Sequence, residues 1–414
     1  MRHYARLIGL AACLLVLLTT CSLPFASGRQ LRIAAFVAAP TTVPGPTVLP
    51  TVTPASGPAA TPALEPPAAT PLAAVLAPAR TGDGAPLPPD LIARAAQMDA
   101  YMASLAQQGA FSGSVLVAAR GRVLLSRGYG LANREEGIAA TASTRYRLAS
   151  VSKPLTALGV LRLAAAGKLD LDASVCAYLA ACPPAWGPIT VAHLLSHSSG
   201  LANYTDFVGF ADVEQSPSSP EQIISRFRDL PLGFVPGTLY HYSNSNYVVL
   251  GRLIEQVAGV SYEEFLRREL FQPLGMQDTG LDPGDFGPLN GTRGYAGGQL
   301  DIPLDVSNLF AAGDLYSSVE DLFKLAQALD AGRLLPPDLA ARMTTPGHGG
   351  YGLGWKIEQR GPHRLVYHPG SMSGAATWFG RYPDQGVTVI VLSNEYYANV
   401  YAIADYLAGQ VLGS

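Results

Sequence analysis

Charged residues are scarce in this chain of 414 residues, because they make up 14% of it against 48% for hydrophobic residues. Lysine is rarer still and occurs only at Lys153, Lys168, Lys324 and Lys356. The formal net charge is −3, and the sequence contains no long basic run. A protein that binds nucleic acid needs a basic patch or stripe to neutralise phosphates. The composition therefore argues against nucleic acid as a partner, and it makes a lysine inside a motif easier to interpret.

The sequence also lacks the patterns that hold metals and nucleotides. His193 and His197 are four residues apart, a spacing that can place two nitrogens on one face of a helix. No glutamate follows His193, as it would in His-Glu-x-x-His, and no third ligand is evident. We therefore expect both histidines to be structural and no metal to be bound. No phosphate loop or dinucleotide fingerprint is present, so no cofactor is expected either.

Cysteine is equally rare, with four residues in the chain. Cys13 and Cys21 lie near the N-terminus, whereas Cys176 and Cys182 lie in the part that is expected to fold. Outside the cytoplasm these last two could form a local disulfide. One continuous helix would put them on different faces, but Pro183-Pro184 ends any helix there. The sequence leaves a disulfide and a pair of buried thiols open.

The N-terminus carries an apolar run with the pattern of an export signal. Met1 to Arg6 is short and positively charged, and Leu7 to Leu18 is apolar but too short for a comfortable membrane span. Leu18-Thr-Thr-Cys21 resembles a bacterial lipobox, although a smaller residue usually stands where Thr20 is. Ala26-Ser-Gly28 offers a rival cleavage site with small residues. We expect an exported protein whose residues 1–28 form a signal peptide or a membrane or lipid anchor, with lipidation at Cys21 left open.

A long segment of biased composition follows. From about Thr41 to Pro89 the sequence is rich in proline, threonine and alanine and shows no hydrophobic period. Such a segment is expected to be an extended, disordered tether. At roughly 3.1 Å per residue in polyproline II, it could reach on the order of 150 Å. We predict a linker at 29–88 and a catalytic domain at 89–414, either secreted or tethered at the cell surface.

Strand signals occur at both ends of the folded part, and helix signals lie between them. A helix is predicted over Leu91 to Gln107, and two apolar runs around Arg120-Gly121 predict a β-hairpin. Near the C-terminus, a closing helix over Val400 to Leu412 follows four predicted strands, over Leu353 to Gln359, Arg364 to Tyr367, Ala375 to Arg381 and Gly386 to Leu392. This order predicts an α/β (α+β) fold: one antiparallel sheet built from both termini and flanked by helices, with an inserted, mostly helical region.

Ser150-Val-Ser-Lys153 is the first candidate for chemistry. Pro154 is tolerated only in the first turn of a helix, so a helix is expected to begin here. Ser150 and Lys153 then share a helix face, and the helix dipole favours a developing alkoxide at Ser150. A buried lysine can lose its proton and act as the base for a hydroxyl nucleophile. Taken alone, however, the motif is expected about once by chance in a chain of this length, and a capping serine beside a solvated lysine fits it better.

Two further segments change that interpretation. Tyr240-His-Tyr-Ser-Asn-Ser-Asn-Tyr247 places Tyr242 and Asn244 on a polar turn before a helix, and His368-Pro-Gly370 falls in a strand context. Ser-x-x-Lys, Tyr-Ser-Asn and a basic residue-x-Gly, in this order, resemble the serine β-lactamase and penicillin-binding-protein superfamily. The chain is most similar to its class C-like branch, which includes class C β-lactamases, D-Ala-D-Ala carboxypeptidases, D-aminopeptidases and β-lactamase-like esterases. The likeness runs from about Phe111 to Ser393.

The resemblance implies a serine β-lactamase/DD-peptidase-like fold and an acyl-serine mechanism. Ser150 would attack the substrate carbonyl, with Lys153 and Tyr242 sharing the proton transfers. Asn244 would hold a substrate amide and the Lys153 side chain. The backbone N–H groups of Ser150 and Ser371 would form the oxyanion hole.

The third motif departs from the family's usual Lys-Thr-Gly or Lys-Ser-Gly, because here it is His368-Pro-Gly370. A lysine would offer a fixed positive charge to a substrate carboxylate, whereas a histidine is largely neutral near pH 7 unless a neighbour raises its pKa. Histidine does occur at this place within the class C-like group. We expect His368 and Gly370 at the substrate site, where the glycine lets a substrate approach the backbone. The replacement leaves acyl transfer intact but argues against strong β-lactam turnover.

Four functions are compatible with this reading. The first is an exported serine hydrolase for D-alanyl peptides or related amides, similar to a D-Ala-D-Ala carboxypeptidase. The alternatives are a β-lactamase-like esterase for short acyl esters, a class C-like β-lactamase, and a penicillin-binding sensor without turnover. The complete set of motif residues argues against the sensor. The expected partner is a small-molecule or peptide substrate such as a cell-wall peptide, and membrane contact is expected only through the N-terminal segment.

Overall fold

The central sheet joins segments from opposite ends of the folded part. The computed structural model describes residues 89–285, 290–302 and 304–413. The predicted signal or anchor segment, the linker and Cys21 lie outside the described residues. The sheet is antiparallel throughout, and its six strands have the order β10-β11-β12-β13-β1-β2. Their bounds are β1 Gly113–Ala119, β2 Arg122–Tyr129, β10 Lys356–Arg360, β11 His363–Met372, β12 Ala375–Tyr382 and β13 Val387–Ser393.

The pairing of β1 with β13 joins the N-terminal hairpin to the four C-terminal strands, and the apolar composition of the two strands favours it. All seven residues of β13 are buried, and so are six of the seven in β1, as expected for a strand that is covered on both faces. Gly113 pairs with Ser393 and Ala119 with Val387, so the register runs the full length of both strands. The predicted antiparallel sheet from both termini is therefore confirmed.

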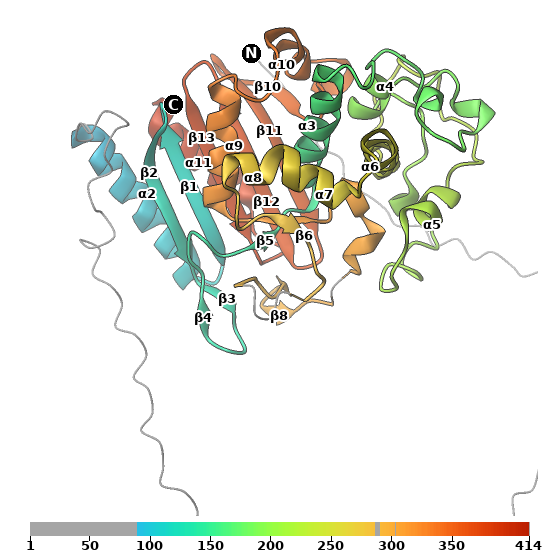
Figure 1. Cartoon of the computed structure of the whole chain (residues 1–414). Coiled ribbons are helices and arrows are strands. Elements are labelled where there is room, and N and C mark those ends of the chain that lie inside the picture. The colour runs from blue at the N-terminus through green and yellow to red at the C-terminus, as the bar shows by residue number, and fades with distance from the viewer. Residues whose placement is uncertain (1–88, 286–289, 303, 414) are drawn as a thin grey trace, which may run out of the picture. The chain divides into compact units, whose positions relative to one another are not determined.

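Helices cover both faces of this sheet (Figure 1). On one face, α2 (Pro89–Gln107) and α11 (Val400–Leu412) pack against Val115 and Val117 of β1. On the other face, Leu116 of the same strand joins the larger core, which includes residues of the inserted region. Successive side chains of a strand point to opposite faces of the sheet. Alternate residues of β1 therefore contribute to the two hydrophobic cores, one on each face.

The inserted region supplies the helices of the second face. It contains α3 (Ser152–Ala165), α4 (Val191–Leu195), α5 (Pro220–Ser225), α6 (Asn244–Ala258), α7 (Tyr262–Leu266), α8 (Gln272–Leu274), α9 (Val319–Asp330) and α10 (Pro337–Met343). Three small sheets accompany them: β3 (Leu131–Asn133) with β4 (Ile138–Ala139), β5 (Tyr146–Arg147) with β9 (Leu315–Ser317) and β6 (Gly280–Leu281), and β7 (Tyr295–Ala296) with β8 (Gln299–Leu300). Helix α3 is buried on nearly all sides, so it forms the centre of this half of the molecule.

Two strand boundaries near the site differ from the prediction. The strand expected from Leu353 begins only at Lys356, because Gly354 adopts φ +88° and turns the chain. The strand expected to end at Tyr367 continues to Met372 and includes the third motif. The proline in that motif does not end the strand, although proline cannot donate to a sheet ladder.

Cys176 and Cys182 form a disulfide. The segment is not one continuous helix, because it comprises two short 3₁₀ helices, η2 (Val175–Ala177) and η3 (Pro184–Trp186). The chain doubles back between them and brings the two Cα atoms to 5.2 Å. Of the two alternatives that the sequence leaves open, the disulfide is the one that the structure contains.

Replacing both cysteines by serine is expected to lower the free energy of unfolding by about 2 kcal/mol, because the bridge closes a short loop in the unfolded chain. Urea unfolding of the wild type and of Cys176→Ser/Cys182→Ser measures this difference. Neither cysteine lines the pocket described below, so turnover should persist below the unfolding transition. The wild type in a reducing agent should unfold at the same midpoint as the double variant. Equal midpoints for the oxidised wild type and the variant would contradict the expectation.

None of the helices among the described residues is both long and apolar enough to cross a membrane.

Candidate active site

The candidate nucleophile lies where a 3₁₀ helix runs into an α-helix. Helix η1 (Ala149–Val151) leads directly into α3, and Ser150 is its middle residue. Ala149, just before it, has φ +49°, a left-handed conformation that is uncommon for a residue other than glycine. Strained backbone of this kind is concentrated at functional sites. One turn later, the Nζ atom of Lys153 lies 3.0 Å from Ser150 Oγ.

Lys153 is completely buried, and burial holds the pKa of its amine well below the usual range. Its Nζ atom lies 2.8 Å from Asn244 Oδ1 and 2.8 Å from the carbonyl oxygen of Ala312. A neutral amine has two N–H donors, and these two oxygens can only accept. Both donors are therefore used, and the lone pair is left facing Ser150 Oγ. This is the geometry of a general base aimed at a hydroxyl nucleophile.

Tyr242 approaches the same hydroxyl from the other side. Its Oη atom donates to Ser150 Oγ at 2.9 Å. Tyr242 keeps some exposed surface at the site. The surrounding protein nevertheless removes most water from its phenol, and this burial raises the pKa of the phenol above the ordinary value. The phenol therefore stays protonated at neutral pH and serves as a donor. Ser150 Oγ thus lies between one group that can take a proton and one that can supply it.

His197 supports the Tyr242 ring, with the two ring centroids 4.3 Å apart. Its Nδ1 accepts from the backbone N–H of Ser243 at 3.2 Å and lies 3.1 Å from Asn246 Nδ2. Burial lowers the pKa of His197, so the ring is neutral. His193 instead caps α4, where its Nδ1 accepts from the backbone of Thr190. Both histidines thus have structural roles, and the described residues contain no group of three or more His, Cys, Asp or Glu that could hold a metal ion.

Asn244, the first residue of α6, is fixed at three points. Its Oδ1 accepts from Lys153, its Nδ2 donates to Thr205 Oγ1 at 3.1 Å, and its backbone N–H donates to Asn203 Oδ1 at 2.9 Å. The amide orientation is therefore set by the protein before any substrate arrives. Asn244 also lines the pocket at Ser150, where a substrate amide could reach it.

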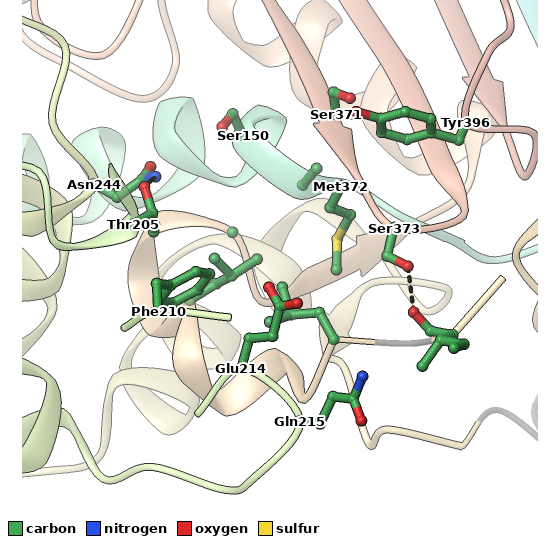
Figure 2. A pocket seen from close by; sticks show the side chains of 16 residues that line it. Ser150, Thr205, Phe210, Glu214, Gln215, Asn244, Ser371, Met372, Ser373 and Tyr396 are labelled. Atoms are coloured by element: carbon green, nitrogen blue, oxygen red, sulfur yellow. Dashed lines mark hydrogen bonds between the residues drawn. The ribbon is translucent and has the colours of Figure 1, made fainter. Parts of the chain in front are cut away.

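The third motif brings β11 against the backbone of η1. A Cβ atom on Gly370 would lie 2.4 Å from the Leu148 carbonyl oxygen, 2.2 Å from Thr377 Oγ1 and 3.1 Å from the Ser150 nitrogen. Only glycine lets these two backbones approach so closely. The backbone of residues 148–150 thus lies directly against Gly370. As a result, the next residue, Ser371, lines the pocket together with Ser150 (Figure 2).

His368 lies behind this arrangement and not in the pocket lining. The side chain is buried, with Nδ1 2.7 Å from the Pro369 carbonyl oxygen and Nε2 2.9 Å from Tyr351 Oη. A carbonyl can only accept, so Nδ1 carries the proton and Nε2 accepts from the tyrosine. Burial lowers the pKa of His368 to about 3. His368 is therefore not among the residues that line the pocket at Ser150, and its Nε2 is already bonded to Tyr351. The expected role of His368 toward a substrate stays a prediction.

A pocket of about 470 Å³ opens onto Ser150 (Figure 2). Its lining consists of Ala149, Ser150, Thr205, Phe210, Glu214, Gln215, Asn244, Ile302, Leu304, Leu309, Ala312, Gly313, Ser371, Met372, Ser373 and Tyr396. The sequence motifs identify Ser150, Asn244 and Ser371 but not the others. Thr205 belongs to the short 3₁₀ helix η4 (Tyr204–Asp206) and Glu214 to the loop that follows it, and neither segment carries a motif. The Ala312 carbonyl that binds Lys153 is a backbone group, which a sequence motif does not reveal.

Substituting Gly370 by alanine is expected to destabilise the protein by about 2–4 kcal/mol, because the new Cβ would overlap backbone atoms that cannot move independently. Activity should fall with it, since β11 and η1 would separate at Ser150. Thermal unfolding and turnover of the purified variant measure both effects. Gly233→Ala is the matched control, because its Cβ would meet nothing closer than 3.7 Å. A Gly370→Ala protein as stable and active as this control would contradict the packing described here.

Three comparisons place the chain among known proteins. Residues 94–413 match the family described as Beta-lactamase. The chain is 30% identical over 319 residues to penicillin-binding protein 4* of Bacillus subtilis, which covers 70% of each protein. It is 29% identical over 365 residues to esterase EstB of Burkholderia gladioli, which covers 74% of this chain and 92% of the esterase. The solved structure of an octameric penicillin-binding protein homologue from Pyrococcus abyssi has a TM-score of 0.70 and 28% identity, with 77% of both chains covered.

Proposed function

The chain belongs to the beta-lactamase family of serine hydrolases, and from this premise we propose that it cleaves D-alanyl amides, or related amides without a carboxylate beside the scissile bond, through an acyl-enzyme on Ser150. The observation that carries the proposal is the environment of Ser150 Oγ. A buried amine lies 3.0 Å away with its other two hydrogen-bonding directions occupied, and a phenol donates from 2.9 Å. No other described hydroxyl in the pocket lining has both partners.

The proton movements follow from these contacts. Ser150 passes its proton to the neutral Lys153 amine as Oγ attacks the carbonyl carbon. The oxyanion that forms is stabilised by the backbone N–H groups of Ser150 and Ser371. Tyr242 then donates its proton to the leaving nitrogen or oxygen as the bond to carbon breaks, and it recovers a proton from the Lys153 ammonium. Water attacks the resulting ester by the reverse proton path, which releases the acid and restores the Ser150 hydroxyl.

Short acyl esters are the second candidate, and the chemistry of the pocket favours them. Its lining includes several apolar side chains, which are Phe210, Ile302, Leu304, Leu309 and Met372, and among the described residues that line it there is no lysine, arginine or histidine. Carboxypeptidase substrates and β-lactams both carry a carboxylate, which would find no positive side chain there. Esters and amides that lack a carboxylate suit this lining better. The likeness to esterase EstB supports the same candidate.

A panel of four substrates tests these proposals: D-alanine p-nitroanilide, a D-Ala-D-Ala peptide, p-nitrophenyl butyrate and nitrocefin. We expect turnover of the anilide or of the ester, and much slower turnover of the two substrates that carry a carboxylate. Ser150→Ala provides the background rate. Stable labelling by a fluorescent penicillin without turnover of any substrate would instead support the sensor and contradict the proposed hydrolysis.

We also propose that the protein is exported and is secreted or held at the cell surface by its N-terminal segment. The support is the signal-like apolar run in the sequence together with the Cys176–Cys182 disulfide, since disulfides persist mainly outside the cytoplasm. Mass spectrometry of the protein from its native host would show cleavage near residue 28, or at Cys21 with a lipid attached. Recovery of the full-length chain from the cytoplasm would contradict this proposal.

A further inference from the structure

One carboxylate lines the pocket beside the nucleophile, and it belongs to Glu214. Figure 2 shows this side chain directed into the pocket, beside Phe210 and across from Ser150 and Ser371. It is neither part of a motif nor involved in the contacts that hold Ser150, Lys153 and Tyr242. The proton transfers described above therefore do not explain its presence.

The backbone holds Glu214 in this position. Its carbonyl oxygen accepts from the Asp305 N–H at 2.8 Å and from Asn308 Nδ2 at 3.3 Å, and its own N–H donates to the Phe210 carbonyl at 2.9 Å. Asn308 is completely buried and also binds the carbonyl of Ser216 at 2.7 Å. The loop that carries Glu214 is thus anchored to the core at the residue itself, so its carboxylate is presented to the pocket by a fixed backbone.

No cation neutralises this carboxylate within the part of the chain that the structure describes. The pocket lining contains no basic side chain, and no described lysine, arginine or histidine forms an ion pair with Glu214. Arg226, which also binds Asn308, donates instead to Asn308 Oδ1 at 3.2 Å and to Ser218 Oγ at 2.7 Å. The Lys153 amine is neutral for the reason given above. The pocket therefore carries an uncompensated negative charge.

A neighbouring pocket, which shares Gln215 and Leu304 with this one, adds no positive charge. Its described lining includes Glu255, Asp282, Asp305 and Asp314, and no lysine or arginine is among these described residues. Asp282 pairs with Arg147 at 2.6 Å and Glu255 pairs with Arg252, while burial raises the pKa of Asp314 and favours its neutral form. None of these groups supplies a positive charge that could neutralise Glu214, and none of them lines the pocket at Ser150. Glu214 is therefore the carboxylate, among the described residues, that faces the nucleophile without a cationic partner.

We propose that Glu214 determines specificity by charge: it selects substrates that carry a protonated amine close to the scissile carbonyl and disfavours those that carry a carboxylate. The proposal rests on the proposed function, because it concerns the substrate of the same pocket. A protonated amine can form a charge-assisted hydrogen bond with the carboxylate, whereas a substrate carboxylate would be repelled and would find no donor to replace it. Among D-alanyl compounds, those with a free amino group satisfy this requirement.

Three phenylboronic acids test the selection without assuming a leaving group, since the serine Oγ adds reversibly to boron. The 3-aminomethyl compound is cationic, the 3-acetamidomethyl compound is neutral and the 3-carboxy compound is anionic. Their Ki values are measured as protection of Ser150 from a fluorescent fluorophosphonate. We expect the cation to bind on the order of tenfold more tightly than the neutral compound, and the anion more weakly than either. In Glu214→Gln the ratio of the cationic to the neutral Ki should approach one.

Asp212→Asn is the matched control, because it removes the same charge from the same loop at an exposed residue that does not line the pocket. This variant should keep the wild-type ratio of Ki values. Equal Ki values for the three compounds in the wild type, or an unchanged ratio in Glu214→Gln, would overturn the proposal while Ser150 labelling still supports the hydrolase. Absence of fluorophosphonate labelling in the wild type would instead contradict the proposed function itself.

Discussion

Replacing Ser150 by alanine is expected to abolish covalent labelling by a fluorophosphonate or a penicillin and to lower turnover by about 10⁴-fold or more. The reason is that no other group at the site can substitute for its hydroxyl. Lys153 is buried beneath it, and the raised pKa of Tyr242 keeps that phenol protonated and therefore a poor nucleophile. In-gel fluorescence measures the labelling, and initial rates with the preferred substrate measure turnover.

The fold should survive this substitution, which makes the result interpretable. Ser150 is partly exposed, and its Oγ contacts are with Lys153 and Tyr242. Removal of the hydroxyl should therefore change the thermal midpoint little. Ser373→Ala is a suitable control, since it removes another hydroxyl from the pocket lining and should leave labelling intact. Labelling that persists in Ser150→Ala would remove Ser150 from the mechanism.

The sequence allowed the central contacts to be predicted because each one involves a side chain in a motif. Ser150 and Lys153 are one helical turn apart, so their proximity follows from helix geometry alone. Tyr242 and Asn244 are about ninety residues away, and only the order of the three motifs indicated that they join the same site. The sheet was also predictable, because the apolar runs at the two ends of the chain need burial on both faces and can provide it for each other.

Other parts of the site could not be predicted, and the reasons differ. His368 lies in β11, one residue beyond the end of the predicted strand, and the position of Tyr351 next to its ring depends on a turn at Gly354 that a strand pattern does not reveal. The Ala312 carbonyl matters only because its 3₁₀ helix places it 2.8 Å from Lys153 Nζ. Glu214 lies in a loop whose composition shows no bias, so nothing local distinguishes it from other surface glutamates. Long-range placement, and not residue type, gives these groups their roles.

Replacing Lys153 by methionine is expected to slow acylation of Ser150 by about 10²–10⁴-fold, which is the usual contribution of a general base. Methionine has similar length and no charge, so it should fill the buried space without a desolvation cost. It would leave Asn244 Oδ1 and the Ala312 carbonyl without the lysine's donors, which is expected to cost about 1–3 kcal/mol in stability. Stopped-flow or manual labelling rates with a fluorophosphonate, which Ser150 Oγ attacks at phosphorus with loss of fluoride, measure the activation of this hydroxyl, and a pre-steady-state burst with a p-nitrophenyl ester measures acylation itself. Lys168→Met, which changes an exposed lysine, should acylate at the wild-type rate.

The pH dependence separates this role from a merely structural one. The base is the neutral amine, so wild-type acylation should fall as the pH is lowered through the pKa of Lys153, which burial sets well below its ordinary value. The methionine variant should lack this acid limb. Stability should show the linked effect: near neutral pH the unfolded chain carries a proton on Lys153 that the folded chain does not, so stability rises with pH. The free energy of unfolding that depends on Lys153 reaches its maximum only above the pKa of a lysine in the unfolded chain, about 10.4. It falls as the pH is lowered from there toward the pKa of Lys153 in the folded protein. Identical acid limbs in the wild type and in Lys153→Met would show that another group is the base.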